Sequence, residues 1–255
     1  MSLLNPFAFA RSVGRAYNKL NGPAPLDEYP DYDAYWKNRA RDGRTSNVLH
    51  RHELIAKLLP EASSVLDVGC GDGTFGQHLA SVRPDCSYHG LDVSNASVEL
   101  ARAKGLAATV IDPDKKLQEQ VGRRFDVVTI MEVLEHVHDA EALFRSLQSV
   151  GAHTIIVTVP NVGFWAHRLR LALFGRFPVT TIIFHMKEHI RFWTYKDFAQ
   201  WVALFGMRIE GFYGQKGTGS RLNDAFATRL PSLFASQVIY VLRPQAGDTA
   251  NGRQE

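Results

Sequence analysis

Short apolar runs recur along the middle of the chain, and each is followed by a longer stretch with apolar residues at helical spacing. The runs occupy residues 64–68, 88–91, 107–111, 125–130 and 154–159. Continuous apolar runs of this length are typical of parallel strands that helices cover on both faces. The pattern therefore predicts an α/β fold built on a mostly parallel sheet.

Proline and glycine residues mark the ends of the predicted helices between these strands. One helix begins near Ser46 and ends at Pro60, and later helices end before Pro84, at Gly105 and at Gly151. Both residue types disfavour the continuation of a helix. Each strand is thus followed by a helix, as connections between parallel strands require.

The last third of the chain has a different pattern. Residues 161–190 are apolar, basic and aromatic, and they are too many for a simple crossover, so we expect a lid insertion there. Thr194 and Asp197 have the spacing of a capping box at the start of a helix. Residues 207–213 and 237–242 predict two further strands, joined by a glycine-rich loop and a short helix, which we expect to pair antiparallel at the sheet edge.

The pattern divides the chain into three parts. Residues 1–45 predict an N-terminal helical extension, residues 46–243 the α/β domain, and residues 244–255 a disordered tail. The extension contains an aromatic cluster that either closes a pocket of the domain or forms a satellite core. The cluster consists of Tyr32, Tyr35 and Trp36, followed by Arg39.

Composition narrows the class of protein. With 255 residues, 45% apolar residues and a net charge of +3, the chain can bury a full core and has little tendency to disorder. Cys70 and Cys86 are too few for a disulfide framework, and no run reaches the roughly 18 apolar residues that span a bilayer. The N-terminus lacks the basic segment and the long apolar stretch that are typical of a secretory signal, so we expect a cytoplasmic protein.

Charge is unevenly distributed along the chain. Residues 142–187 contain no carboxylate but include Arg145, Arg168 and Arg170, and such a basic face favours an anionic partner. The basic stretches are short and no nucleic-acid reader motif accompanies them, so we expect no nucleic-acid binding. Residues 164–174 mix basic residues with aromatic residues and leucines. They predict a lid over the pocket of an acceptor substrate. A second interpretation is that they make a peripheral contact with the inner membrane surface or with a lipid-linked substrate.

The first predicted strand leads directly into a glycine-rich turn. Residues 69–73 read G-C-G-D-G, and glycine lets the backbone approach a ligand closely. Asp92 ends the next strand, where a carboxylate can accept both ribose hydroxyls of an adenosine. The spacing differs from the G-x-G-x-x-G of dinucleotide sites, and Asp67 and Asp72 would repel a diphosphate but attract a cationic ligand. The turn therefore favours S-adenosylmethionine over NAD.

These segments resemble the class I S-adenosylmethionine-dependent methyltransferases. Residues 67–73 look like the first motif of that family, and residues 91–94 look like its second. The resemblance implies a Rossmann-like, seven-stranded, mostly parallel sheet with the order 3-2-1-4-5-7-6, and S-adenosylhomocysteine as the product of the cofactor. It implies cofactor contacts from Asp67, Gly69, Cys70, Gly71, Asp92, Val93, Asp112, Met131 and Glu132.

The same resemblance implies roles within this set. The backbone of residues 69–71 would contact the methionine part, Asp92 the ribose and Val93 the adenine. Asp112 would contact the adenine amine, or it is a solvated loop carboxylate. Residues 131–137 look like the segment after the fourth strand in small-molecule methyltransferases, where Glu132 could face the cofactor.

His136 follows the fourth strand at the carboxyl edge of the sheet, where open α/β sheets bind ligands. A neutral imidazole there can take the proton of an acceptor hydroxyl, so we expect His136 to be the catalytic base, with a helix-capping or core histidine as the alternative. We expect Glu135 to be solvated and His138 to lie on the surface. His185 and His189 would share one face of a helix, but no wider Cys/His pattern adds a third ligand, so we expect no metal site. An approach of one or both histidines to the acceptor pocket stays open.

A narrower resemblance is to the MetW-like proteins. Residues 160–165 and 189–194 carry it, together with Arg168, Gly175 and Pro178. MetW-like proteins are associated with methionine biosynthesis, where they assist homoserine acylation, and related sequences occur among cell-surface glycan enzymes. Two expectations follow. The chain methylates a small molecule such as a sugar, a glycolipid or another anionic metabolite, or it is an S-adenosylmethionine-binding partner of a homoserine acyltransferase.

Overall fold

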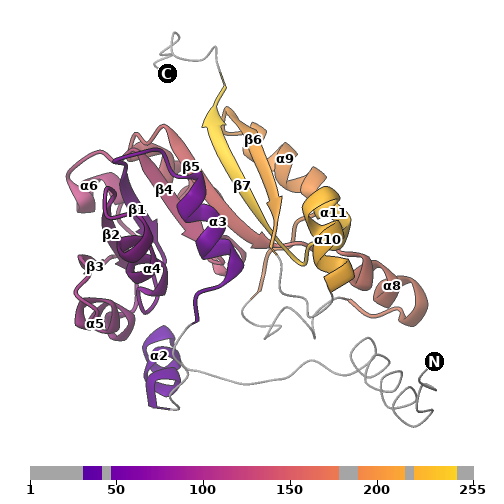
Figure 1. Ribbon diagram of the computed structural model, residues 1–255, viewed down its shortest axis with the longest axis horizontal. Coiled ribbons are helices and arrows are strands. Elements are labelled where there is room, and N and C mark those ends of the chain that lie inside the picture. Colours follow the sequence, from indigo (N-terminus) through magenta and orange to yellow (C-terminus); the bar gives the residue numbers. More distant parts are fainter. Residues whose placement is uncertain (1–30, 42–46, 178–188, 216–220, 246–255) are drawn as a thin grey trace.

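One sheet runs through the computed structural model, which describes residues 31–41, 47–177, 189–215 and 221–245. Its seven strands lie in the order β3-β2-β1-β4-β5-β7-β6 (Figure 1). The strands are β1 (Ser64–Val68), β2 (Ser87–Asp92), β3 (Ala108–Val110), β4 (Val127–Met131), β5 (Thr154–Pro160), β6 (Met207–Gly214) and β7 (Gln237–Pro244).

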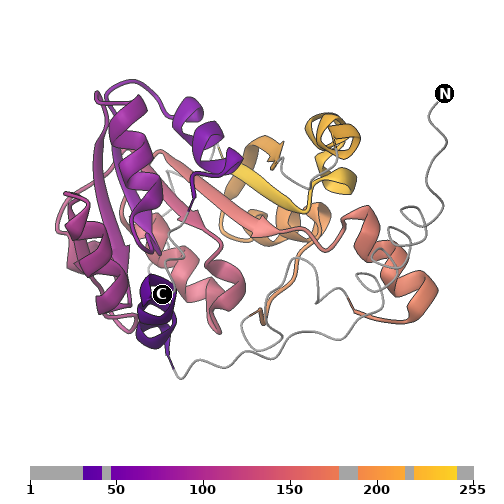
Figure 2. The same cartoon turned by 60° about the horizontal axis from the view of Figure 1, so that its bottom comes forward.

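Helices cover both faces of the sheet (Figure 2). In the described part of the chain they alternate with the strands from β1 to β5, and they cluster again before β6 and between β6 and β7. They are α2 (Tyr32–Arg41), α3 (His50–Leu58), α4 (Thr74–Val82), α5 (Asn95–Ala103), α6 (Leu117–Val121), the 3₁₀ turn η1 (Leu134–His136), α7 (Ala140–Ser149), α8 (Trp165–Phe174), α9 (Tyr195–Ala203), α10 (Arg221–Arg229) and α11 (Pro231–Phe234).

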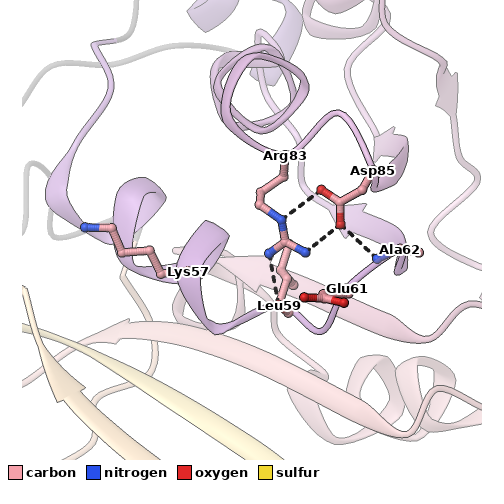
Figure 3. Close-up of a pocket in the computed structure, with 6 residues that line it drawn as sticks. All are labelled: Lys57, Leu59, Glu61, Ala62, Arg83 and Asp85. Carbon is pink, nitrogen blue, oxygen red and sulfur yellow. Dashed lines mark hydrogen bonds and ion pairs between the residues drawn. The ribbon is translucent and has the colours of Figure 1, made fainter.

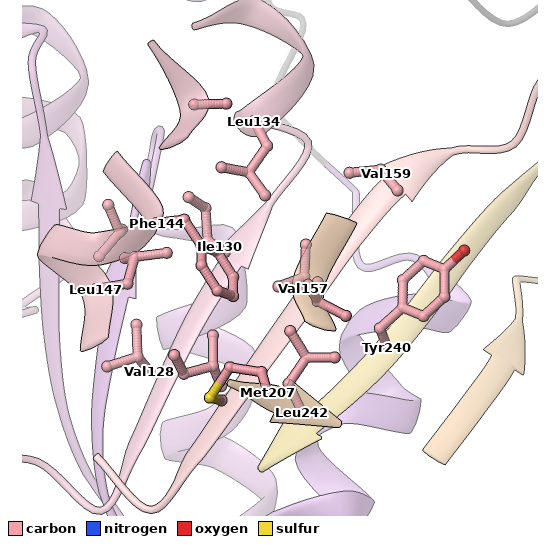
Figure 4. Close-up of a cluster of buried hydrophobic side chains, with 14 of the residues drawn as sticks. Val128, Ile130, Leu134, Phe144, Leu147, Val157, Val159, Met207, Tyr240 and Leu242 are labelled. Atoms are coloured by element: carbon pink, nitrogen blue, oxygen red, sulfur yellow. The ribbon is translucent and has the colours of Figure 1, made fainter. Parts of the chain in front are cut away.

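The core lies on both sides of the central strands. Successive strand residues point to opposite faces. Val127 of β4 therefore packs in a cluster with Phe75 of α4. Val128 packs in the larger cluster, which contains Phe144 of α7 (Figure 4). Phe198 of α9 belongs to the same larger cluster. Because both faces are covered, the strands need apolar residues at consecutive positions, which explains the uninterrupted runs in the sequence.

The structure confirms the predicted topology. The strands β1 to β5 pair parallel, and β7 pairs antiparallel with both β5 and β6 at the edge of the sheet. The predicted capping box is also present. The Asp197 backbone N–H donates to Thr194 Oγ1, and the Thr194 backbone N–H donates to Asp197 Oδ2, both at 3.3 Å.

Other segments differ from the prediction or lie outside the described residues. The helix predicted to begin near Ser46 begins at His50. Two helices, α10 and α11, stand where the sequence predicted a loop and one short helix, because Ala227 is buried in the core and tertiary packing outweighs the turn-forming residues nearby. The lid (161–190) is described only in part, and most of the extension and of the tail falls outside. No helix among the described residues is long and apolar enough to cross a membrane.

Candidate functional site at the carboxyl edge of the sheet

The glycine-rich turn after β1 is tied to the neighbouring strand. The backbone N–H groups of Gly69 and Cys70 both donate to the carbonyl of Leu91, at 2.7 and 2.9 Å. Gly69 and Gly71 have φ angles of 76° and 54°, in the left-handed region that favours glycine. A Cβ atom on Gly69 would overlap Cγ2 of Val133, so the segment after β4 packs directly on the turn. The turn and the end of β4 thus form one continuous surface.

Asp92, at the end of β2, holds the turn in place. Its Oδ2 accepts a hydrogen bond from the Gly71 backbone N–H, and its Oδ1 accepts one from the Ser94 backbone N–H, both at 2.9 Å. The carboxylate is buried, and burial raises its pKa against the lowering effect of these hydrogen bonds. Val93, the next residue, is 45% exposed and offers an apolar surface beside the carboxylate.

Helix α2 packs over this edge, next to α5 (Figures 1 and 2). A Cβ atom on Gly71 would lie 2.7 Å from the Trp36 ring, so the indole covers the turn. Asp33 accepts hydrogen bonds from Ser94 Oγ at 2.5 Å and from the Ala96 backbone N–H at 3.1 Å, and these bonds lower its pKa. A carboxylate is favoured at the N-terminus of a helix such as α5. The aromatic cluster thus includes a side chain that closes the edge of the turn.

Asp67 lies inside the sheet, just before the turn. Its side chain is fully buried, with Oδ1 accepting from Thr129 Oγ1 at 2.8 Å and Oδ2 accepting from the Tyr88 hydroxyl at 2.9 Å. Burial raises the pKa of Asp67 to about 6, although the two hydrogen bonds lower it. Both carboxylate oxygens of Asp67 are therefore hydrogen-bonded within the protein.

Two other residues predicted to contact the cofactor lie on either side of Asp92. Cys70 is buried in the turn, and burial raises the pKa of its thiol. Asp112 is exposed after β3, where its Oδ1 accepts from the Asp114 backbone N–H at 3.0 Å and its Oδ2 pairs with Lys115 at 3.2 Å. These partners belong to its own loop, as expected of a solvated loop carboxylate, while the pairing of β3 with β2 places the loop at the same edge of the sheet.

The end of β4 is held firmly. Met131 packs against the apolar cluster under α4. Glu132 has a φ of 54°, unusual for a residue with a side chain, and such strained backbone concentrates at functional sites. Its Oε1 accepts from Thr158 Oγ1 at 2.8 Å, and its Oε2 accepts from Gln237 Nε2 at 2.6 Å. Glu132 thus joins β4, β5 and β7 at the carboxyl edge of β4.

The turn η1 carries a carboxylate and an imidazole that meet a second imidazole from the segment before α9. Glu135 is fully buried, so the expectation of a solvated side chain was wrong. The rings of His136 and His189 meet edge to face with centroids 4.5 Å apart, and Nε2 of His136 lies 3.9 Å from Oε1 of Glu135. Burial raises the pKa of Glu135 well above its ordinary value and lowers that of His189 to about 3.

A surface depression of about 600 Å³ lies at the opposite, amino edge of the sheet (Figure 3). Two of its charged groups have structural partners: Arg83 donates to the backbone carbonyls of Ala56 and Leu59 and pairs with Asp85 at 2.8 Å. Ligands of open α/β sheets bind at the carboxyl ends of the strands. The candidate site is therefore the edge formed by the glycine-rich turn, Asp92 and the end of β4.

Comparison with known protein families covers most of this fold. Residues 50–242 match the family described as "Methionine biosynthesis protein MetW". The chain belongs to the MetW family. The match runs from α3 to β7, so it includes the whole candidate site of this MetW chain except α2.

Curated relatives of this MetW chain include O-methyltransferases. A protein named "Ubiquinone biosynthesis O-methyltransferase" from Bordetella avium is 31% identical over 133 residues, which are 48% of this chain and 54% of that protein. Its namesake from Xanthomonas axonopodis pv. citri is 30% identical over 184 residues, 66% of this chain and 72% of that protein. A "Bifunctional methionine biosynthesis protein MetXA/MetW" from Rhodopirellula baltica is 29% identical over 136 residues, 49% of this chain and 21% of that protein. The chain thus spans about half the length of the first of these relatives.

Solved structures share the fold of this MetW chain. An S-adenosylmethionine-dependent methyltransferase from Anabaena variabilis matches with a TM-score of 0.55 at 17% identity, over 88% of this chain and all of that one. Magnesium protoporphyrin IX methyltransferase from Synechocystis, with bound S-adenosylhomocysteine, matches with a TM-score of 0.52 at 16% identity, over 94% of this chain and 97% of that one. The predicted class I methyltransferase fold is confirmed, and S-adenosylmethionine is the cofactor of proteins with this fold.

Sequence analysis missed the burial of Glu135 next to His136, and it left open whether His189 approaches the acceptor pocket. The position of Glu135 directly before His136, in the loop after β4, was the signal that could have identified it. The burial of Glu135, however, depends on the distant segment that packs on this loop. His189 was paired in the sequence with His185, which lies outside the described residues, whereas the structure places His189 against His136. His138 is exposed, as expected.

Proposed function

We propose that this chain is an S-adenosylmethionine-dependent O-methyltransferase that acts on a small-molecule acceptor. The observation that carries the proposal is the glycine-rich turn, whose Gly71 N–H is held by the buried carboxylate of Asp92 at the carboxyl ends of β1 and β2. A turn of this kind lets a ligand approach the backbone, and Asp92 stands beside it for a ribose. Membership of the MetW family and relatives named O-methyltransferase support the reaction class.

The residues present fit this cofactor, which supplies a methyl group on a sulfonium. Asp92 accepts backbone hydrogen bonds from Gly71 and Ser94, and a carboxylate oxygen has two acceptor positions, so Asp92 can also accept a hydrogen bond from a ribose hydroxyl. We assign the methionine part to the backbone of residues 69–71 and the adenine to Val93 and Asp112. Met131 and Glu132, at the end of β4, would contact the same cofactor.

The acceptor binds on the side of η1 in this proposal. His136 is partly exposed there and assists the loss of the proton from the acceptor hydroxyl. Transfer of a methyl group is an in-line displacement, so most of the rate enhancement comes from holding the acceptor oxygen and the methyl group in attack geometry. Trp36 covers the turn and limits the access of water to the site.

We propose that the acceptor is an anionic metabolite, a sugar or glycolipid being the best match, and that it is presented at a membrane surface. Helix α8 supports this. It carries no carboxylate, Leu171 and Leu173 are 53% and 67% exposed, and Arg168 is exposed on the same helix, whereas Arg170 is buried. Exposed leucines beside arginines are typical of helices that lie on anionic lipid surfaces. In this proposal the protein works at the cytoplasmic side of the membrane.

A second function has specific support. The family description names methionine biosynthesis, and one relative joins MetXA and MetW in a single protein. The alternative is therefore a protein that binds S-adenosylmethionine and regulates a homoserine acyltransferase without transferring the methyl group.

Calorimetry and turnover measurements separate these functions. Asp92→Ala should weaken S-adenosylmethionine binding by at least about tenfold, because the ribose loses charge-assisted hydrogen bonds. Asp114→Asn, at an exposed loop position, should leave the affinity unchanged. Equal affinity in the Asp92 variant would refute the cofactor site. An enzyme should release S-adenosylhomocysteine from a suitable acceptor, and His136→Ala should slow release while cofactor binding persists. Binding without turnover, together with co-purification of an acyltransferase, would establish the alternative.

A further inference from the structure

Three potential metal ligands from two separate segments meet beside the proposed cofactor site. Glu135 and His136 lie in η1, and His189 lies more than fifty residues later in the chain. One carboxylate oxygen and one ring nitrogen from each histidine lie within 4.8 Å of one another. Within the described ranges, 31–41, 47–177, 189–215 and 221–245, this is the group of such residues that could hold a metal ion.

The acidic member of this group is buried without a hydrogen-bond donor. Glu135 has no exposed surface, and neither of its carboxylate oxygens accepts a hydrogen bond. His189 is 8% exposed, and its Nδ1 also lacks a hydrogen-bond partner. Buried polar atoms are nearly always hydrogen-bonded in proteins, and a buried carboxylate is especially costly without a compensating partner. These atoms therefore point to a ligand that completes their coordination.

The backbone holds the two segments together firmly enough for a preformed site. The Ile190 and Arg191 backbone N–H groups both donate to the Glu135 carbonyl, at 2.9 and 3.2 Å. The Arg191 guanidinium makes a two-pronged contact with Glu141, at 2.8 and 2.7 Å, and Glu141 also accepts from the Trp201 indole at 2.9 Å. His189 is therefore fixed next to η1 by its neighbours in the chain, and the contact of the two imidazoles follows from this anchoring.

We propose that Glu135, His136 and His189 form a binding site for a divalent first-row transition metal ion. Two imidazole nitrogens and one carboxylate oxygen suit Zn²⁺, Co²⁺ or Fe²⁺, whereas Mg²⁺ and Ca²⁺ favour sets made of oxygen atoms. Ligand bonds of about 2.0–2.2 Å require the donor atoms to stand roughly 3.3–3.6 Å apart in a tetrahedral site. The donor atoms now lie within 4.8 Å of one another, so metal binding requires them to move closer by at most about 1.5 Å. Three protein ligands leave at least one coordination position open.

The open coordination position gives the metal site a role in methyl transfer, and this role rests on the proposed function. Val133, two residues before Glu135, packs on Gly69, so the site lies close to the turn that receives the cofactor. Glu132, three residues before Glu135 at the end of β4, adds a second carboxylate to this edge, and such a surrounding favours a cation. A hydroxyl of the acceptor bound at the open position loses its proton to water more readily. The oxygen then bonds to the methyl carbon as the carbon–sulfur bond breaks. In this step His136 promotes the loss of the proton as a metal ligand and does not accept the proton itself.

Metal titration of the untagged, chelator-treated protein tests the proposal. We expect Co²⁺ to produce the visible absorption of a low-symmetry complex at one equivalent, and Zn²⁺ to displace it in calorimetry. Glu135→Gln and His189→Gln should each weaken Co²⁺ and Zn²⁺ binding by at least about 100-fold, because removal of a ligand costs more than removal of an outer partner. His138→Gln and Glu119→Gln remove an exposed imidazole and an exposed carboxylate and should leave the affinity unchanged.

Thermal unfolding distinguishes variants that lose metal binding from variants that fail to fold. Without metal, Glu135→Gln should melt no lower than the unchanged protein, because it replaces a buried carboxyl group whose oxygens have no hydrogen-bond partner. Added Zn²⁺ should raise the melting temperature of the unchanged protein and leave that of Glu135→Gln where it was. Absence of saturable one-equivalent binding, or equal affinity in the ligand and control variants, would overturn the proposal. S-adenosylmethionine calorimetry on the same samples separates the two ideas. Cofactor binding without metal binding refutes the metal site alone, and metal binding without cofactor binding refutes the proposed function alone.

Discussion

Replacement of Asp67 by asparagine should change the stability of the protein in a direction that depends on pH. Burial raises the pKa of Asp67 from 3.8 to about 6. Below pH 3.8 the folded and unfolded chains both carry the proton, so the group makes no pH-dependent contribution. Between that pH and about 6 the unfolded chain releases the proton and the folded chain keeps it, so the free energy of unfolding falls as pH rises. Above about pH 6 both states have released the proton, and the free energy of unfolding falls no further on account of Asp67.

The magnitude follows from the width of the window. A pKa difference of about two units corresponds to about 3 kcal/mol of lost stability at pH 8. Asparagine has no charge to bury, but it offers one acceptor oxygen to Thr129 and Tyr88 in place of two, which costs about 1 kcal/mol. Asp67→Asn should therefore be about 2 kcal/mol more stable than the unchanged protein at pH 8 and about 1 kcal/mol less stable at pH 4.

Urea denaturation at intervals between pH 4 and pH 8 measures this difference. Asp114→Asn, at an exposed position, is the matched control and should differ from the unchanged protein by a constant amount. A stability difference for Asp67→Asn that does not vary with pH, or that varies in the opposite direction, would refute the reasoning. The protein retains a destabilising carboxylate next to the turn, and natural proteins accept such costs at functional sites. Asp67→Asn should accordingly bind S-adenosylmethionine less tightly while folding more stably at neutral pH.

Two further predictions concern the surfaces around the site. Trp36→Ala removes the ring that covers Gly71. Calorimetry should show S-adenosylmethionine binding weakened by roughly two- to tenfold, as expected for the loss of one aromatic contact. An unchanged affinity would show that α2 does not contribute to the site. Leu171→Glu together with Leu173→Glu should reduce recovery with anionic vesicles in flotation by at least about tenfold. Leu204→Glu, at the 82% exposed position directly after α9, should not reduce it. Equal recovery of the unchanged protein and both variants would remove the proposed membrane contact.

Local patterns in the sequence determined much of this protein. The alternation of apolar runs with helical stretches set the element order, since burial on both faces leaves no other pattern for a central strand. The capping box at Thr194 and the glycine-rich turn at residues 69–73 were also readable, because each depends on residues only a few positions apart. The strand order came from the resemblance to a family, and the structure confirmed it.

Tertiary structure alone decided the composition of the site. Trp36 covers Gly71 because α2 packs against α5, and no spacing in the sequence encodes that contact. Glu135 is buried because the segment around Ile190 closes over η1, and the same closure brings His189 to His136. Local sequence specifies backbone conformation and amphipathicity over a few residues. The burial of a carboxylate and the meeting of two imidazoles depend on the packing of distant segments, which forms only when the whole chain folds.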